Sequence, residues 1–80
     1  MISYGKETKL QPQAVIERAV CFFGPAGIGL DIVDHGQGCA RFEGGGGHVS
    51  IACCQGKQRT QVSLEAREWE YQAREFIGKL

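Results

Sequence analysis

The chain has 80 residues, and its nine lysines and arginines are balanced by nine aspartates and glutamates, so its formal net charge is zero. A neutral chain has no broad positive field for a nucleic-acid backbone or an anionic membrane surface, so we expect neither partner. The longest apolar run, Ala19 to Phe23, is far shorter than the ~20 residues of a membrane span, and the N-terminus has no apolar signal-peptide core. We therefore expect one cytosolic domain, residues 1–80, with four reduced cysteines and a size that favours self-association.

The first part of the chain predicts an irregular segment followed by a helix. Residues 1–10 carry no periodic pattern that we interpret as a helix or a strand. From Pro12 to Phe23 the apolar residues recur at the 3.6-residue period of an amphipathic helix. Proline suits the first turn of a helix, and Gly24-Pro25 is a typical helix end.

Glycine clusters organise the middle of the chain, because ten of the twelve glycines lie between Gly24 and Gly56 and separate short apolar/polar alternations. The alternations predict four antiparallel strands at Leu30–His35, Cys39–Glu43, His48–Gln55 and Gln58–Leu64. The three turns give consistent registers, in which His35 pairs with Cys39 and Cys54 pairs with Arg59. One sheet face then collects the predicted strand core, namely Leu30, Ile32, Ala40, Phe42, Val49, Ile51, Cys53, Val62 and Leu64.

The C-terminal segment from Glu65 to Leu80 predicts a second amphipathic helix, with its apolar residues within about 100° of one another on a helical projection. Ser63 is a candidate N-cap for this helix. The predicted fold is therefore α+β, a two-layer sandwich of order α-β-β-β-β-α in which both helices cover one face of an antiparallel meander.

Two glycine-rich segments invite a comparison with phosphate-binding loops. Such a loop follows a strand and opens a helix, whereas Gly24 to Gly29 follows a helix, and no Gly-Lys-Ser/Thr sequence follows it. Gly44 to Gly47 also lacks a following helix, and we expect a mobile hairpin loop there. We predict no cofactor from either segment.

Cysteine and histidine residues gather on the second face of the predicted sheet. Cys53 and Cys54 point to opposite faces because they are adjacent in a strand, so they do not form a metal motif. His48 lies two residue pairs away from the predicted Cys39–His35 pair, so we expect no metal site. Cys39 and His35 remain weak candidates for a catalytic thiolate and its base, and an enzyme is the less favoured interpretation.

The second sheet face is the strongest candidate for function. Its centre is partly apolar and its rim is charged, which is the composition of a surface covered by a partner. The candidate interface or ligand residues are Val33, His35, Cys39, Arg41, His48, Ser50, Ala52, Cys54 and Arg59. We predict a non-catalytic module that forms a homodimer or binds a protein partner through this face. The alternative is a small-ligand-binding or Cys/His-dependent catalytic domain, in which Arg41 could bind a carboxylate.

Overall fold

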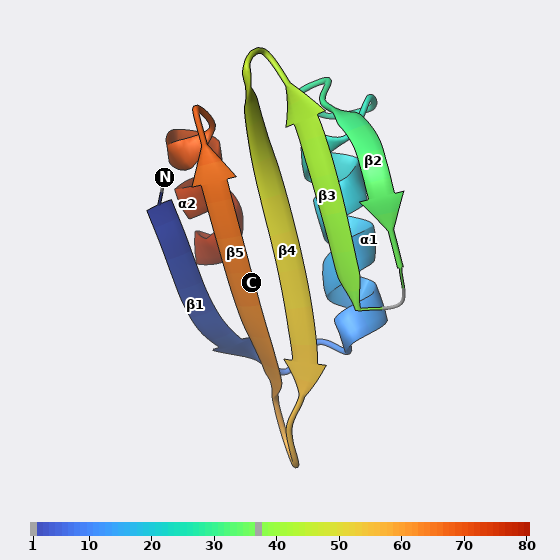
Figure 1. Ribbon diagram of the computed structural model, residues 1–80. Helices are drawn as coiled ribbons and strands as arrows, with labels where there is room; N and C mark the ends of the chain where they lie inside the picture. The colour runs from blue at the N-terminus through green and yellow to red at the C-terminus, as the bar shows by residue number, and fades with distance from the viewer. Residues whose placement is uncertain (1, 37) are drawn as a thin grey trace.

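The computed structural model describes residues 2–36 and 38–80, which form two helices and a five-stranded antiparallel sheet (Figure 1). In chain order the elements are β1 (Ile2–Thr8), α1 (Pro12–Phe23), β2 (Asp31–His35), β3 (Cys39–Gly44), β4 (Gly47–Gln55), β5 (Thr60–Arg67) and α2 (Glu70–Gly78). The strand order across the sheet is β1-β5-β4-β3-β2. Both helices lie on the same side of the sheet, with α1 against β3 and β4 and α2 against β5 and β1 (Figure 1). The predicted two-layer α+β sandwich is confirmed, with one further strand at its N-terminal edge.

The core lies between the sheet and the two helices. Its buried apolar residues are Val15, Ile16, Ala19, Phe23, Leu30, Ala40, Phe42, Val49, Ile51, Val62, Leu64, Ala66, Ala73 and Phe76. Of the predicted strand core, Ile32 on the edge strand β2 is 38 % exposed and Cys53 is half-buried, and the other members are buried. Neither helix in the described ranges is long and apolar enough to cross a membrane.

Helix α1 has the bounds predicted from its sequence, Pro12–Phe23. Proline occupies its first turn, where a missing backbone N–H leaves no hydrogen bond unmade. At the other end, the N–H of Gly24 donates to the carbonyl of Val20 at 3.0 Å, which satisfies one of the last carbonyls of the helix.

The prediction of an irregular segment over residues 1–10 is wrong, because Ile2–Thr8 forms strand β1 and pairs along its whole length with β5. Without β1, the backbone of β5 would be an unpaired sheet edge. A side-chain contact also holds the end of β1 in place, since the hydroxyl of Thr60 donates to the carbonyl of Leu10 at 2.6 Å. The charged residues of this segment mask the strand pattern in the sequence.

The predicted start of the second helix is also wrong, because β5 continues to Arg67 and α2 begins only at Glu70. Burial alternates along the whole of β5, which is the period of a strand with one covered face. Ser63 therefore lies within the strand and does not cap a helix. The chain reverses at Glu68, whose φ of 70° lies in the left-handed region. Ala66 fits the helical stripe and the strand alternation equally well, which explains the error.

The three predicted hairpin registers agree with the structure to different degrees. The β3–β4 register is confirmed by the pairs Phe42↔Val49 and Glu43↔His48. The β4–β5 register is offset by two residues from the prediction, since Cys54 pairs with Gln61 and not with Arg59. A two-residue offset keeps every side chain on its predicted face.

A β-bulge between Ile32 and Asp34 changes the first hairpin more severely. Ile32 pairs with Phe42 as predicted, but beyond the bulge Asp34 pairs with Arg41 and His35 with Ala40. The extra residue turns the side chains that follow the bulge to the opposite faces of the sheet. The predicted His35–Cys39 pair is therefore wrong.

The β3–β4 connection is a tight turn and not the four-residue loop predicted over Gly44 to Gly47. Gly44 and Gly47 pair as strand residues, and only Gly45 and Gly46 lie between them. Both have positive φ values, 59° and 82°, which is the requirement of a type I′ hairpin turn. The glycines thus satisfy a backbone requirement of this hairpin.

Candidate functional site

The candidate site is the sheet face that carries no helix, which we call the open face. The strand registers and the alternation of strand side chains define its members. They are Ser3, Gly5 and Glu7 of β1, Asp31 and Asp34 of β2, Cys39, Arg41 and Glu43 of β3, His48, Ser50, Ala52 and Cys54 of β4, and Gln61, Ser63, Glu65 and Arg67 of β5. Figure 1 shows the sheet from this side, with both helices behind it.

A row of small side chains crosses the centre of the open face. Gly5 pairs with Ser63, Ser63 with Ala52, and Ala52 with Cys39, so these four residues lie side by side on four adjacent strands. All four are exposed. We call this row the small-residue band. These small side chains leave the middle of the open face flat.

Charged residues occupy the rows on one side of the band. The first row runs Ser3, Glu65, Ser50, Arg41 and Asp34, and the second runs Arg67, His48, Glu43 and Asp31. The Nε of Arg41 lies 3.1 Å from Oε2 of Glu43, and about half of each side chain is exposed. An exposed pair of this kind contributes about 0–1 kcal/mol, so it orients Arg41 more than it stabilises the fold.

The structure brings together six of the nine residues predicted for this face. Cys39, Arg41, His48, Ser50, Ala52 and Cys54 all lie on it. Val33 lies in the bulge of the edge strand β2 and is 50 % exposed. Arg59 lies in the β4–β5 connection, beyond the strands, and does not pair with Cys54.

His35 does not share the open face with Cys39. Its cross-strand partner is Ala40, which is buried on the helix side. It also lines a cavity of about 570 Å³ together with Pro12 and Ile16 of α1. A general base must lie within hydrogen-bond reach of its nucleophile. In the observed register His35 is not the cross-strand neighbour of Cys39.

The other histidine, His48, lies on the open face but is remote from Cys54. It pairs with Glu43 and Arg67 at one end of β4, whereas Cys54 lies at the other end of the same strand. Over residues 2–36 and 38–80, no three His, Cys, Asp or Glu side chains are grouped so that they could hold a metal ion.

The four cysteines have different environments. Cys39 and Cys54 are exposed on the open face, and Cys21 is exposed on α1. Cys53 is half-buried on the helix side. Its burial raises the pKa of the Cys53 thiol, and the neighbouring sulfurs of Cys54 and Cys39 raise it further. Cys53 is therefore the thiol least suited to nucleophilic chemistry.

The sequence prediction missed the contributions of β1 and of the end of β5 to this face. Gly5 completes the small-residue band, and Glu65 and Arg67 extend the charged rows. The signal that could have identified β5 is its unbroken alternation from Thr60 to Arg67. The signal for β1 is weaker, because the charged Lys6 lies between Tyr4 and Thr8 among the alternate positions that face the helices.

Comparison with known proteins found no matching family model, no matching curated protein and no matching solved structure.

Proposed function

We propose that this chain is a small, non-catalytic, cytosolic module that forms a homodimer by packing its open face against that of a second copy. The small-residue band is the observation that carries the proposal. A solvated sheet face normally presents polar side chains at its centre, whereas here the centre consists of Gly5, Ser63, Ala52 and Cys39. Two sheets pack about 10 Å apart, and small side chains at the contact permit that approach.

The area of the open face suits a reversible dimer. Five strands spaced about 4.8 Å apart, with about seven residues each at 3.3 Å per residue, span about 550 Å². Two such faces bury about 1,100 Å² in total, which is close to the lower limit for a specific protein interface. We therefore expect weak, concentration-dependent association.

The charge pattern of the open face favours a second copy as the occupant. Consider a two-fold axis that lies between the two copies and runs parallel to the small-residue band. Each band residue would then lie over the same residue of the partner, and a row on one side of the band would lie over the partner's row from the other side. Glu65 would then lie over the partner's Gln61, and Ser3 over the partner's Glu7. No carboxylate of these rows would lie over another carboxylate, so this arrangement brings no like charges together.

Sedimentation velocity over micromolar to millimolar protein tests the proposal. The wild-type chain is expected to move from monomer to dimer as the concentration rises. Ala52→Arg introduces a charge at the centre of the band, where the side chain is exposed, and is expected to leave a folded monomer. The matched control is Ala26→Arg, at a position that is also exposed but lies in the connection after α1, and it is expected to dimerise like the wild type. A monomer at all concentrations, or equal dimerisation of both variants, would contradict the proposal.

A further inference from the structure

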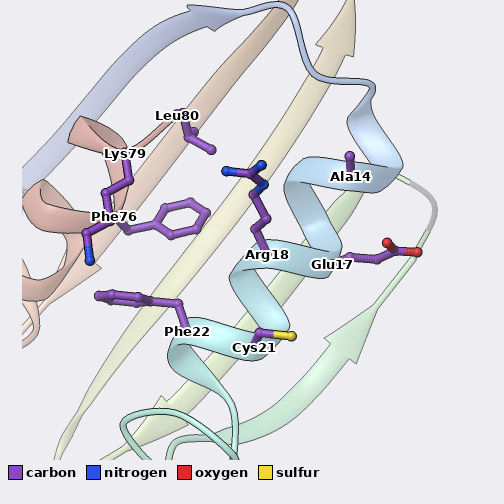
Figure 2. Close-up of a pocket in the computed structure, with 8 residues that line it drawn as sticks. All are labelled: Ala14, Glu17, Arg18, Cys21, Phe22, Phe76, Lys79 and Leu80. Carbon is purple, nitrogen blue, oxygen red and sulfur yellow. The ribbon is translucent and has the colours of Figure 1, made fainter.

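On the opposite side of the sheet, a groove separates the two helices. Because α1 packs on β3 and β4 while α2 packs on β5 and β1, the helices flank a cavity of about 550 Å³ (Figure 2). Ligand sites typically have volumes of about 300–1,000 Å³. The groove is thus large enough for a small organic molecule.

Aromatic and aliphatic side chains from both helices form the floor of the groove. Phe22 of α1 and Phe76 of α2 have ring centroids 5.6 Å apart, and Figure 2 shows both rings directed into the space between the helices. Phe76 is buried, whereas Phe22 and Leu80 are half-buried and keep part of their apolar surface at the groove. This floor suits the apolar body of a ligand.

The rim of the groove carries two cationic side chains, Arg18 of α1 and Lys79 near the end of α2. Arg18 extends from α1 across the groove toward Phe76 and Leu80 (Figure 2), and among the described residues it forms no ion pair. The Nζ of Lys79 lies 5.5 Å from the centroid of the Phe22 ring, and its ion pair with Glu75 is long, at 3.9 Å.

Glu17 is the acidic residue that lines the groove, and it is not directed at Arg18. The side chain of Glu17 points away from the space between the helices (Figure 2). One of its carboxylate oxygens accepts a hydrogen bond from the amide of Gln13 at 3.4 Å, on the outer surface of α1. Glu17 therefore leaves the guanidinium of Arg18 available to a ligand.

A second cavity of about 400 Å³ adjoins the groove and shares Arg18 and Leu80 with it. Lys9 and Arg59 also line this cavity, against the single carboxylate of Glu7. Cationic side chains thus converge at one end of the groove in a chain whose net charge is zero. The charge at this end is complementary to an anion.

We infer that the groove between α1 and α2 binds a small organic carboxylate with an apolar body. The body lies on Phe22, Phe76 and Leu80, and the carboxylate accepts two parallel hydrogen bonds from the guanidinium of Arg18. This site is separated from the open face by the sheet, so a ligand in the groove and a second copy on the open face do not compete.

Titration of the ¹⁵N-labelled full chain with decanoate, below its micelle-forming concentration, tests this inference. Saturable amide shifts are expected in the second half of α1 and around Phe76 to Leu80. Arg18→Gln is expected to weaken binding about tenfold, because a hydrogen bond to a charged group is lost. The matched control, Glu17→Gln on the same helix, is expected to bind decanoate at least as tightly as the wild type. Decanol, which has the same body without the charge, is expected to bind at least tenfold more weakly.

Several outcomes would overturn the inference. These are the absence of saturable shifts, shifts confined to the open face, equal affinity of Arg18→Gln and wild type, and equal affinity for decanoate and decanol. Circular dichroism of each variant checks that Arg18→Gln is folded, and Arg18→Lys, which keeps the charge, distinguishes electrostatic attraction from two-point hydrogen bonding. Binding by Arg18→Lys that matches the wild type would contradict the two-point geometry.

Discussion

The indole N–H of Trp69 donates a hydrogen bond to the carbonyl of Gly44 at 2.9 Å and thereby joins the start of α2 to the end of β3. Trp69 is half-buried, and its six-membered ring lies over Gly45 in the hairpin turn. A Cβ atom at Gly45 would lie 2.9 Å from this ring. The glycine cluster and the tryptophan therefore depend on one another.

Substitution by alanine is expected to destabilise the fold by different amounts at the two glycines of the turn. Gly45→Ala forces a left-handed conformation on a residue with a side chain, which costs about 1–2 kcal/mol, and it also displaces the ring of Trp69. We expect a loss of about 2–4 kcal/mol in the free energy of unfolding, measured by urea denaturation. Gly46→Ala is the control, because its φ is also positive but no atom lies within 4 Å of the added Cβ. Equal losses for both variants would show that the contact with Trp69 has no energetic weight.

The buried hydroxyl of Thr60 anchors the connection between β1 and α1. It donates to the carbonyl of Leu10 at 2.6 Å, and Thr60 is only 2 % exposed. Thr60→Val keeps the shape but leaves that carbonyl unpaired, so we expect a loss of about 1–3 kcal/mol in the free energy of unfolding. Thr60→Ser retains the hydroxyl and is expected to be less destabilised than Thr60→Val in the same urea titration. The reverse order would contradict a structural role for this hydrogen bond.

Cys53 predicts a pH dependence of stability. Burial, followed by the nearby Cys54 and Cys39, raises the pKa of its thiol in the folded state. The neutral Cys53 thiol therefore contributes fully to stability below the ordinary thiol pKa of 9.0. This contribution is lost as the pH rises through the folded-state pKa. We expect the wild-type chain to lose stability above about pH 9 more steeply than Cys53→Ala does, measured by urea denaturation under reducing conditions. Parallel curves for the two proteins would exclude Cys53 as the source. Cys21→Ala, which removes an exposed thiol, is the control.

The register predicts that His35 does not activate Cys39. The bulge in β2 pairs His35 with Ala40, on the face opposite to Cys39. We expect His35→Ala to change the alkylation rate of Cys39 by less than about twofold at neutral pH, because a thiol is activated only by a base or cation close to it. Mass spectrometry after a short iodoacetamide pulse measures the rate at each cysteine. A large decrease for Cys39 alone would restore the Cys/His interpretation.

Much of the fold could be predicted because local patterns and tertiary structure agree. The helical period of Pro12–Phe23 and the strand alternation of Cys39–Gly44 each specify one structure, and the observed bounds follow them closely. Elsewhere the local pattern was ambiguous. Ala66 fits both a strand and a helix, and its pairing with Val49 of β4 and Ile2 of β1 decides its state.

The errors at the candidate site have tertiary causes. A bulge is a single extra residue without a strong sequence signal, and the one at Val33 moved His35 to the other face. β1 was missed because its pairing partner is β5, more than fifty residues away in the chain, and local periodicity does not report such a contact. The groove was missed because Phe22 and Phe76 lie on different helices, and the sequence does not reveal how far apart the helices pack.

The face-to-face dimer is tested most directly by isotope-filtered NOE measurements on a mixture of labelled and unlabelled chains. At a protein concentration at which sedimentation detects association, the Ala52 methyl group of a labelled copy is expected to give intermolecular NOEs to the unlabelled copy's Ala52 and Ser63. Intermolecular NOEs that arise only from the helices or from the edge strands β1 and β2, with none from Ala52, would contradict the account.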